Sequence, residues 1–212
     1  MAKTIYLVRH GESEHNAGEI WQEGDSPLTE RGKAQARLVG ERCLQLDIDV
    51  VVASSLVRAK ETASIINERI KKSVEYNDLF IERRHHTEFI GKRKDDPKVR
   101  RMERFLLEKL STPGFRYADE ENGEDLQARA GNALAYLETH TQDNILIVTH
   151  SMFLRALAAR VLFGSAVSGH EIAHCMRVLK MANTGISIFR YDSNDSLSDW
   201  RLVVWNDHAH LG

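Results

Sequence analysis

Short, continuous apolar runs recur along the chain at residues 5–8, 50–53 and 145–148. Each run is rich in β-branched side chains and shows no alternation with polar positions. This pattern is typical of strands that are buried on both faces of a sheet. Near the C-terminus, residues 185–191 and 201–205 predict two further strands, which a polar turn joins in a hairpin-like arrangement.

Stretches with helical spacing separate and follow these runs. Apolar residues recur every three or four positions within 34–43, 59–70, 126–137 and 154–161, and this spacing predicts four helices. Strands that alternate with helices indicate an α/β fold. We therefore predict a three-layer α/β/α protein with a mostly parallel central sheet and at least one antiparallel edge.

Residues 91–121 differ in character from the rest of the chain. They are dense in charge, contain Pro97 and Pro113, and carry a predicted helix with one apolar face. We interpret this segment as an insertion within a single domain of residues 1–212, lying over the edge of the sheet as a candidate lid. Its basic side chains either form a solvated helical face or hold a second anionic group of a substrate.

Composition and charge narrow the class of protein. The 212 residues are 42% hydrophobic and 28% charged with a net charge of −2, which is typical of a globular domain and gives no global attraction to nucleic acid or anionic lipid. No apolar run approaches the roughly 18 residues of a membrane span, and Cys43 and Cys175 form no metal-binding or disulfide pattern. We expect a cytoplasmic monomer or homodimer without nucleic-acid or membrane partners.

The candidate chemistry lies where the predicted strands end. The first run leads directly into Arg9 and His10, the third into His150, and Arg58 follows the second run in the first turn of the next helix. Ligands of open α/β sheets collect beyond the carboxyl ends of the strands. Guanidinium groups match phosphate oxygens, and a neutral imidazole, favoured by flanking arginines, is a competent nucleophile. These four residues predict a phosphoryl-transfer site that requires no metal and no cofactor.

Two other histidine patterns point elsewhere. Residues 170–174 spell His-Glu-Ile-Ala-His, which satisfies the H-E-x-x-H pattern of zinc metallopeptidases. No third ligand is indicated nearby, so we predict no metal site. The sequence His208-Ala209-His210 is expected to lie in a frayed C-terminal tail.

Five segments of the chain together resemble a known family. They are residues 7–16 (Leu-Val-Arg-His-Gly-Glu-Ser-Glu-His-Asn), 26–36, 54–63, 148–151 and 183–186. In this order they resemble the histidine phosphatase superfamily, whose hallmark is an Arg-His-Gly tripeptide after the first strand. The superfamily includes cofactor-dependent phosphoglycerate mutases, fructose-bisphosphatases and broad acid phosphatases. The resemblance covers the chain apart from the insertion and implies a phosphoglycerate mutase-like fold.

The resemblance also implies roles for individual residues. It makes His10 the nucleophile, with Arg9, Arg58 and His150 binding and stabilising the transferring phosphoryl group. Asn16 occupies the position that contacts phosphate in many members of the family.

The proton donor for the leaving oxygen is less sharply implied. In the family it is a carboxylate that follows the pocket arginine in the chain. Glu82 fits this pattern best, and Glu88 and Asp78 stay open as alternatives.

Three functions follow from these observations. The first is a phosphomonoester phosphatase that acts on a small phosphorylated substrate through a phosphohistidine on His10. The second is a phosphoglycerate mutase, whose relatives carry a longer basic lid. The third, from another class, is a catalytically inactive module that binds phosphorylated ligands. The sequence does not identify the substrate.

Overall fold

The computed structural model describes residues 2–21 and 25–212. Its strands are β1 (Ala2–Arg9), β2 (Val50–Ala53), β3 (Ser73–Tyr76), β4 (Asn144–Thr149), β5 (Ile186–Asp192) and β6 (Trp200–Asp207). Its α-helices are α1 (Glu14–Ala17), α2 (Glu30–Cys43), α3 (Val57–Ile70), α4 (Pro97–Lys109), α5 (Gly123–Thr139), α6 (Ser151–Phe163) and α7 (Gly169–Val178). Short 3-10 helices are η1 (Asp78–Phe80), η2 (Thr87–Phe89) and η3 (Ala209–Leu211).

The six strands form one mixed sheet in the order β3-β2-β4-β1-β5-β6. Strands β3, β2, β4 and β1 are parallel, whereas β5 and β6 add an antiparallel edge. The predicted sheet and its C-terminal hairpin are therefore confirmed. The apolar runs form β1, β2 and β4, because only central strands are covered on both faces. The apolar pattern does not predict β3, which is a mostly exposed edge strand.

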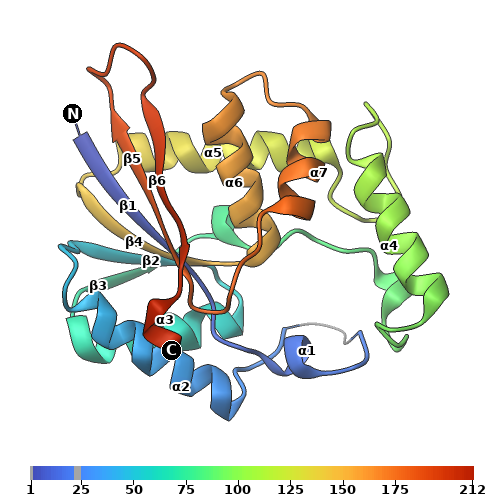
Figure 1. Ribbon diagram of the computed structural model, residues 1–212, viewed down its shortest axis with the longest axis horizontal. Helices are drawn as coiled ribbons and strands as arrows, with labels where there is room; N and C mark the ends of the chain where they lie inside the picture. Colours follow the sequence, from blue (N-terminus) through green and yellow to red (C-terminus); the bar gives the residue numbers. More distant parts are fainter. Residues whose placement is uncertain (1, 22–24) are drawn as a thin grey trace.

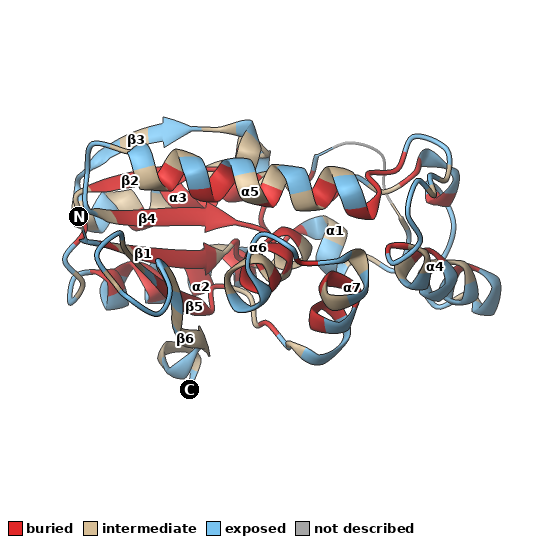
Figure 2. Ribbon diagram, turned by 90° about the horizontal axis from the view of Figure 1, so that it is seen from above, coloured by how far each residue is buried: buried red, intermediate tan, exposed pale blue. Residues whose placement is uncertain are grey.

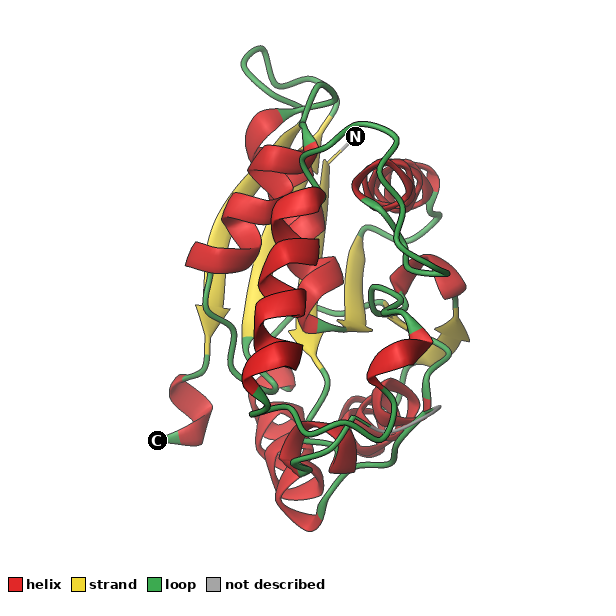
Figure 3. Cartoon of the chain, turned by 90° about the vertical axis from the view of Figure 1, so that its right-hand side faces the viewer, coloured by secondary structure: helices red, strands yellow, loops and turns green. Residues whose placement is uncertain are grey.

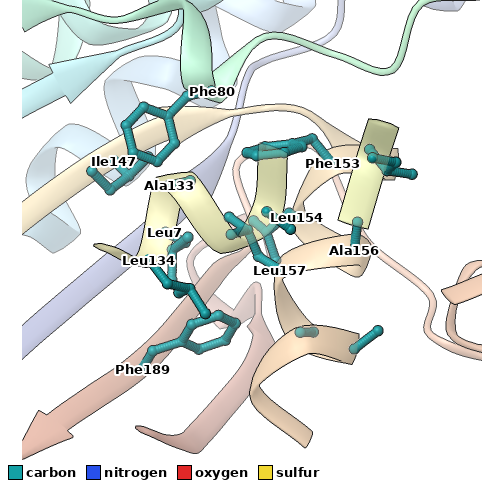
Figure 4. Packing of buried hydrophobic residues seen from close by; sticks show 14 of the residues in the cluster. Leu7, Phe80, Ala133, Leu134, Ile147, Phe153, Leu154, Ala156, Leu157 and Phe189 are labelled. Atoms are coloured by element: carbon teal, nitrogen blue, oxygen red, sulfur yellow. The ribbon is translucent and has the colours of Figure 1, made fainter. Parts of the chain in front are cut away.

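Helices cover both faces of this sheet, so the three-layer prediction is confirmed (Figures 1 and 3). On one face, β1, β2 and β4 share a hydrophobic cluster with α5, α6 and α7, built around fully buried residues such as Phe80, Phe153 and Phe189 (Figure 4). On the other face, the alternate side chains of the same strands pack against α2 and α3. This packing fixes the ends of the parallel strands relative to one another, and the site depends on that arrangement.

The charged segment 91–121 lies beyond the carboxyl ends of the parallel strands, where Figure 2 shows α4 past the arrowheads of the sheet. Asp96 caps α4 through the backbone N–H of Lys98, and Pro97 occupies the first turn. The apolar face of α4 forms a separate small cluster with Phe89 and Trp21. The segment is therefore anchored to residues at the mouth of the sheet, a position suited to the predicted lid.

The prediction of a frayed C-terminal tail is wrong. Residues 209–211 form η3, which packs on α2. His210 Nε2 lies 3.1 Å from the hydroxyl of buried Thr184, and this contact ties the end of the chain to the loop before β5. Within the described residues, no helix combines the length and apolar character that crossing a bilayer requires.

Candidate functional site

The carboxyl ends of the central strands bring the predicted residues together. His10 follows β1 and His150 follows β4, and because these strands are parallel neighbours the two imidazole centroids lie 5.0 Å apart. Arg58, in the first turn of α3, reaches the same point, with its Nε 3.3 Å from His10 Nε2. Three segments distant in sequence thus meet at one edge of the sheet.

Hydrogen bonds define the protonation state of His10, which is 2% exposed. Its Nδ1 lies 2.6 Å from the carbonyl oxygen of Gly11, and since a carbonyl only accepts, Nδ1 carries the proton. Nε2 then presents a lone pair, toward which Arg58 donates. Burial, followed by the charges of Arg58 and Arg9, holds the pKa of His10 well below 6.5. The ring is therefore neutral at pH 7, with Nε2 as the available nucleophile.

The backbone around His10 is fixed by a close approach to α2. A side chain at Gly11 would place its Cβ 2.5 Å from the carbonyl oxygen of Gly32, so only glycine fits. The Gly11 N–H donates to the Thr62 hydroxyl at 3.1 Å, and the Asn183 amide donates to the carbonyl oxygen of His10 at 2.9 Å. The Arg-His-Gly tripeptide is thus held by α2, α3 and the loop before β5.

His150 is fully buried and oriented by a serine at the end of β2. Its Nε2 lies 2.7 Å from Ser54 Oγ, which also accepts the backbone N–H of Leu56. The Ser54 hydroxyl proton needs an acceptor, and His150 Nε2 satisfies it. His150 therefore carries its proton on Nδ1, which has no hydrogen-bond partner in the described part of the chain. An unsatisfied buried donor beside His10 is suited to receive a phosphoryl oxygen.

The two arginines of the site are held by different partners. Arg9 donates from Nη1 to the carbonyl of Met181 at 2.8 Å, and burial lowers its pKa to about 10, a value that leaves it charged at pH 7. Arg58 forms an ion pair with Asp25 at 2.9 Å. The Asp25 carboxylate also accepts the backbone N–H of Val57, at the start of α3. Asp25 thus orients Arg58 toward His10.

Glu82 lies at the N-terminus of α6, in the same cavity. Its Oε1 accepts the backbone N–H groups of Arg83, Met152 and Phe153 at 2.9–3.1 Å, whereas Oε2 accepts only the Met152 N–H, at 3.2 Å. The carboxylate therefore caps the helix mainly through one oxygen. Oε2 keeps an unoccupied lone pair and is the oxygen able to carry a transferable proton.

The remaining sequence candidates lie outside this cluster or at its rim. Glu88 is exposed and accepts the Tyr117 hydroxyl at 2.8 Å. Asp78 is also exposed, and neither carboxylate lines the cavity that holds His10. Asn16 is an exposed residue of α1 that does line this cavity. Position therefore favours Glu82 among the three acids and leaves Asn16 within reach of a bound ligand.

The site opens into a cavity of about 600 Å³. Arg9, His10 and Arg58 form its floor, and residues before and within the charged segment form its walls. Of the basic residues 92–104, Lys94 lines this cavity and Arg104 lines a neighbouring one. Arg93 instead pairs with Glu19 and Asp95 on the surface.

The H-E-x-x-H pattern has a structural explanation. Its Glu171 forms a capping box with Ser168 at the start of α7, and both histidines are exposed. Among the described residues, no group of three or more His, Cys, Asp or Glu side chains could hold a metal ion. The glutamate of the pattern is therefore a helix-capping residue in this chain.

Several site residues have no distinct signal in the sequence. Asp25 contacts Arg58, and Ser54 contacts His150, only because the fold brings these distant positions together, and Asp and Ser are common in loops. Four aromatic residues line the cavity: Trp21, His85 and His86 lie on loops, and Phe89 lies in the three-residue helix η2, so none belongs to a periodic pattern. The acidic cluster 119–121 and 124–125, which either pairs with the basic stretch or caps the next helix on sequence grounds, does cap α5, because Asp125 forms a capping box with Asn122. Glu120 pairs with the buried Arg83, and Glu121 pairs with Arg129.

Fold and site together define a class: an α/β protein with a small-anion pocket of paired histidines and arginines at the carboxyl edge of its sheet. The profile of the histidine phosphatase superfamily (branch 1) matches residues 5–208. The chain belongs to this superfamily, as the motifs indicated.

Comparison with individual proteins agrees with this assignment. The chain is 32% identical over 211 residues to a probable phosphoglycerate mutase GpmB of Salmonella arizonae, covering 98% of this chain and 94% of that protein. Among solved structures, Bacillus stearothermophilus YhfR superimposes with a TM-score of 0.81 at 26% identity, covering 99% of each chain. A mycobacterial glucosyl-3-phosphoglycerate phosphatase shares the fold, with a TM-score of 0.75, 24% identity and coverage of 96% and 99%.

Proposed function

We propose that the protein is a phosphomonoester phosphatase that forms a phosphohistidine on His10. The observation that carries this proposal is the neutral His10, whose Nε2 lone pair faces the Arg58 guanidinium in a buried pocket. The pocket supplies a nucleophile and fixed cations at the same point, and phosphoryl transfer needs both. The mycobacterial phosphatase of the same fold supports hydrolysis as the outcome.

The geometry supports the following sequence of steps. Arg9, Arg58 and the Nδ1–H of His150 bind the phosphoryl oxygens, and His10 Nε2 attacks phosphorus in line with the ester bond. As the P–O bond breaks, the proton on Glu82 Oε2 passes to the leaving oxygen. Water then attacks the phosphohistidine, its proton returns to Glu82, and inorganic phosphate leaves. Each fixed donor is expected to contribute roughly 3 kcal/mol to the transition state.

The test is covalent labelling. Wild-type protein, treated with EDTA and mixed with a ³²P-labelled phosphomonoester, is quenched in base, which preserves phosphohistidine. Label and hydrolysis should both appear in the wild type and vanish in His10→Ala. A matched control is His174→Ala, which removes an exposed histidine of α7. Activity lost to EDTA, or label that persists in His10→Ala, would contradict the proposal.

A phosphoglycerate mutase is the second candidate, because the GpmB relatives carry that name. The same assay distinguishes the two activities. Incubation with 3-phosphoglycerate and bisphosphoglycerate yields 2-phosphoglycerate from a mutase and inorganic phosphate from a phosphatase. A protein that binds phosphate and never acquires label would be the inactive binding module instead.

A further inference from the structure

Four aromatic side chains form a continuous wall in the cavity above His10. These are Trp21, His85, His86 and Phe89, and we call them the aromatic wall. Ring centroids are 5.2 Å apart for Trp21 and His85, 5.5 Å for Trp21 and Phe89, and 4.0 Å for His86 and Phe89. These contacts hold the four rings together, and all four side chains contribute to the lining of the cavity that holds His10.

The aromatic wall also carries hydrogen-bonding groups that the described chain does not satisfy. His86 is 3% exposed, yet both of its ring nitrogens lack a partner, and the Trp21 Nε1–H is likewise buried and unpartnered among the described residues. Leaving such groups unsatisfied costs about 1–3 kcal/mol each. A ligand with complementary polar atoms would recover this loss.

The basic side chains beside the aromatic wall differ in their partners. Arg83 is buried and bonded to Glu120 and to the carbonyl of Glu121. Lys94 donates to the carbonyls of His15 and Gly18. Arg84 also lines the cavity but is exposed to solvent. The buried Arg83 is therefore already paired with a carboxylate, whereas the partners of Lys94 named here are neutral carbonyls.

A second cavity of about 670 Å³ borders the aromatic wall, because Trp21, His85 and Phe89 line both cavities. Other residues that line it belong to α4 and α7, whose ribbons are drawn in Figure 1. Its lining includes the apolar side chains of Leu106, Leu107, Met152 and Ala173. The cavity that holds His10 has a volume of about 600 Å³, so an alcohol larger than a three-carbon acid can contact the aromatic wall while its phosphate stays at His10.

From these contacts we infer that the aromatic wall binds the alcohol portion of the substrate, and that this portion carries an aromatic or heteroaromatic ring. The inference rests on the proposed phosphatase function and adds the substrate class. Ring surface and unsatisfied hydrogen-bonding groups both favour such an alcohol over phosphoglycerate.

Binding of non-hydrolysable ligands tests the inference without relying on turnover. Calorimetry would compare 2-phenylethylphosphonate with ethylphosphonate, which differ only in the ring. The wild type should bind the first at least about tenfold more tightly. Phe89→Leu should reduce this ratio at least threefold. The control with the same substitution is Phe105→Leu on α4, because Phe105 lines neither cavity and the ratio should not change.

Kinetics extends the test to substrates with identical leaving oxygens. Adenosine 5′-monophosphate and ribose 5-phosphate both release a 5′-alcohol, so a ratio of kcat/KM at least tenfold in favour of the nucleotide is expected. His86→Phe should lower that ratio, because it keeps the ring and removes both nitrogens. Equal binding of the two phosphonates, or a preference for 3-phosphoglycerate over the nucleotide, would overturn the inference. If His10 is still labelled in that case, the proposed phosphatase function holds and only the inferred substrate class fails.

Discussion

Substituting Glu82 by glutamine separates two tasks that the structure places on one side chain. The carboxylate accepts backbone N–H groups of Met152 and Phe153 at the start of α6, and it shares the cavity with His10. Glutamine keeps one acceptor oxygen, but it has neither the negative charge of the carboxylate form nor the transferable proton of the acid form. Glu82→Gln should therefore affect stability slightly and catalysis strongly.

The magnitudes follow from these contacts. Losing the anionic acceptor at a helix N-terminus costs about 1 kcal/mol of unfolding free energy. Losing a general acid slows transfer from alkyl phosphates by about 10²–10⁴-fold. For p-nitrophenyl phosphate the loss should stay below about tenfold, because p-nitrophenolate leaves without protonation.

Single-turnover rates for ethyl phosphate and p-nitrophenyl phosphate provide the measurement, with urea unfolding as the measure of stability. Glu88→Gln is the matched control, because Glu88 is exposed and lies outside the cavity. Equal slowing of both substrates by Glu82→Gln would refute the role of Glu82 as the acid. A leaving-group-dependent loss in Glu88→Gln would transfer that role to Glu88.

Three further predictions concern the support of the site. Ser54→Ala removes the hydroxyl donor that fixes the tautomer of His150, so kcat should fall about tenfold. ¹⁵N NMR should show a changed His150 tautomer in this variant, and Ser54→Thr should restore both kcat and the tautomer. Arg129→Met leaves the buried Glu121 carboxylate unpaired and should cost about 3 kcal/mol in urea unfolding; a loss below 1 kcal/mol would contradict the buried pair. Burial holds the folded-state pKa of His10 and of His150 well below 6.5, so below pH 6.5 the unfolded chain binds protons that the folded chain does not. The unfolding free energy should then fall by about 1.4 kcal/mol per pH unit for each of these histidines, and a flat profile between pH 7 and pH 5.5 would show that they titrate normally.

The sequence predicts the central fold and the cluster around His10 for the same physical reason. Strands buried on both faces must be apolar along their whole length, so β1, β2 and β4 are visible as uninterrupted runs. Their carboxyl ends meet because they are parallel, and each residue that directly follows a run is therefore placed without knowledge of any loop. His10 and His150 are located in this way.

The edge strand β3 and the chain end follow no such rule. Residues 73–76 are mostly exposed and show no apolar run. Residues 209–211 are held by a contact between His210 and Thr184 that connects distant parts of the chain. The local sequence pattern carries no information about contacts between distant residues. The prediction of a frayed tail failed because such a tertiary contact holds these residues in place.

The leaving-group side of the site is built on a different principle from the phosphoryl side. Its aromatic wall is formed by Trp21, His85, His86 and Phe89, in loops and the short helix η2, whose positions depend on the charged segment and on buried pairs such as Arg83 with Glu120. Loops tolerate substitution and insertion far more readily than central strands. Relatives can therefore keep the histidines and arginines at the strand ends while exchanging the surfaces that select the alcohol. Membership of the superfamily therefore indicates the chemistry at phosphorus, and so does the name of a relative. The identity of the substrate must instead be established from the aromatic wall of this chain.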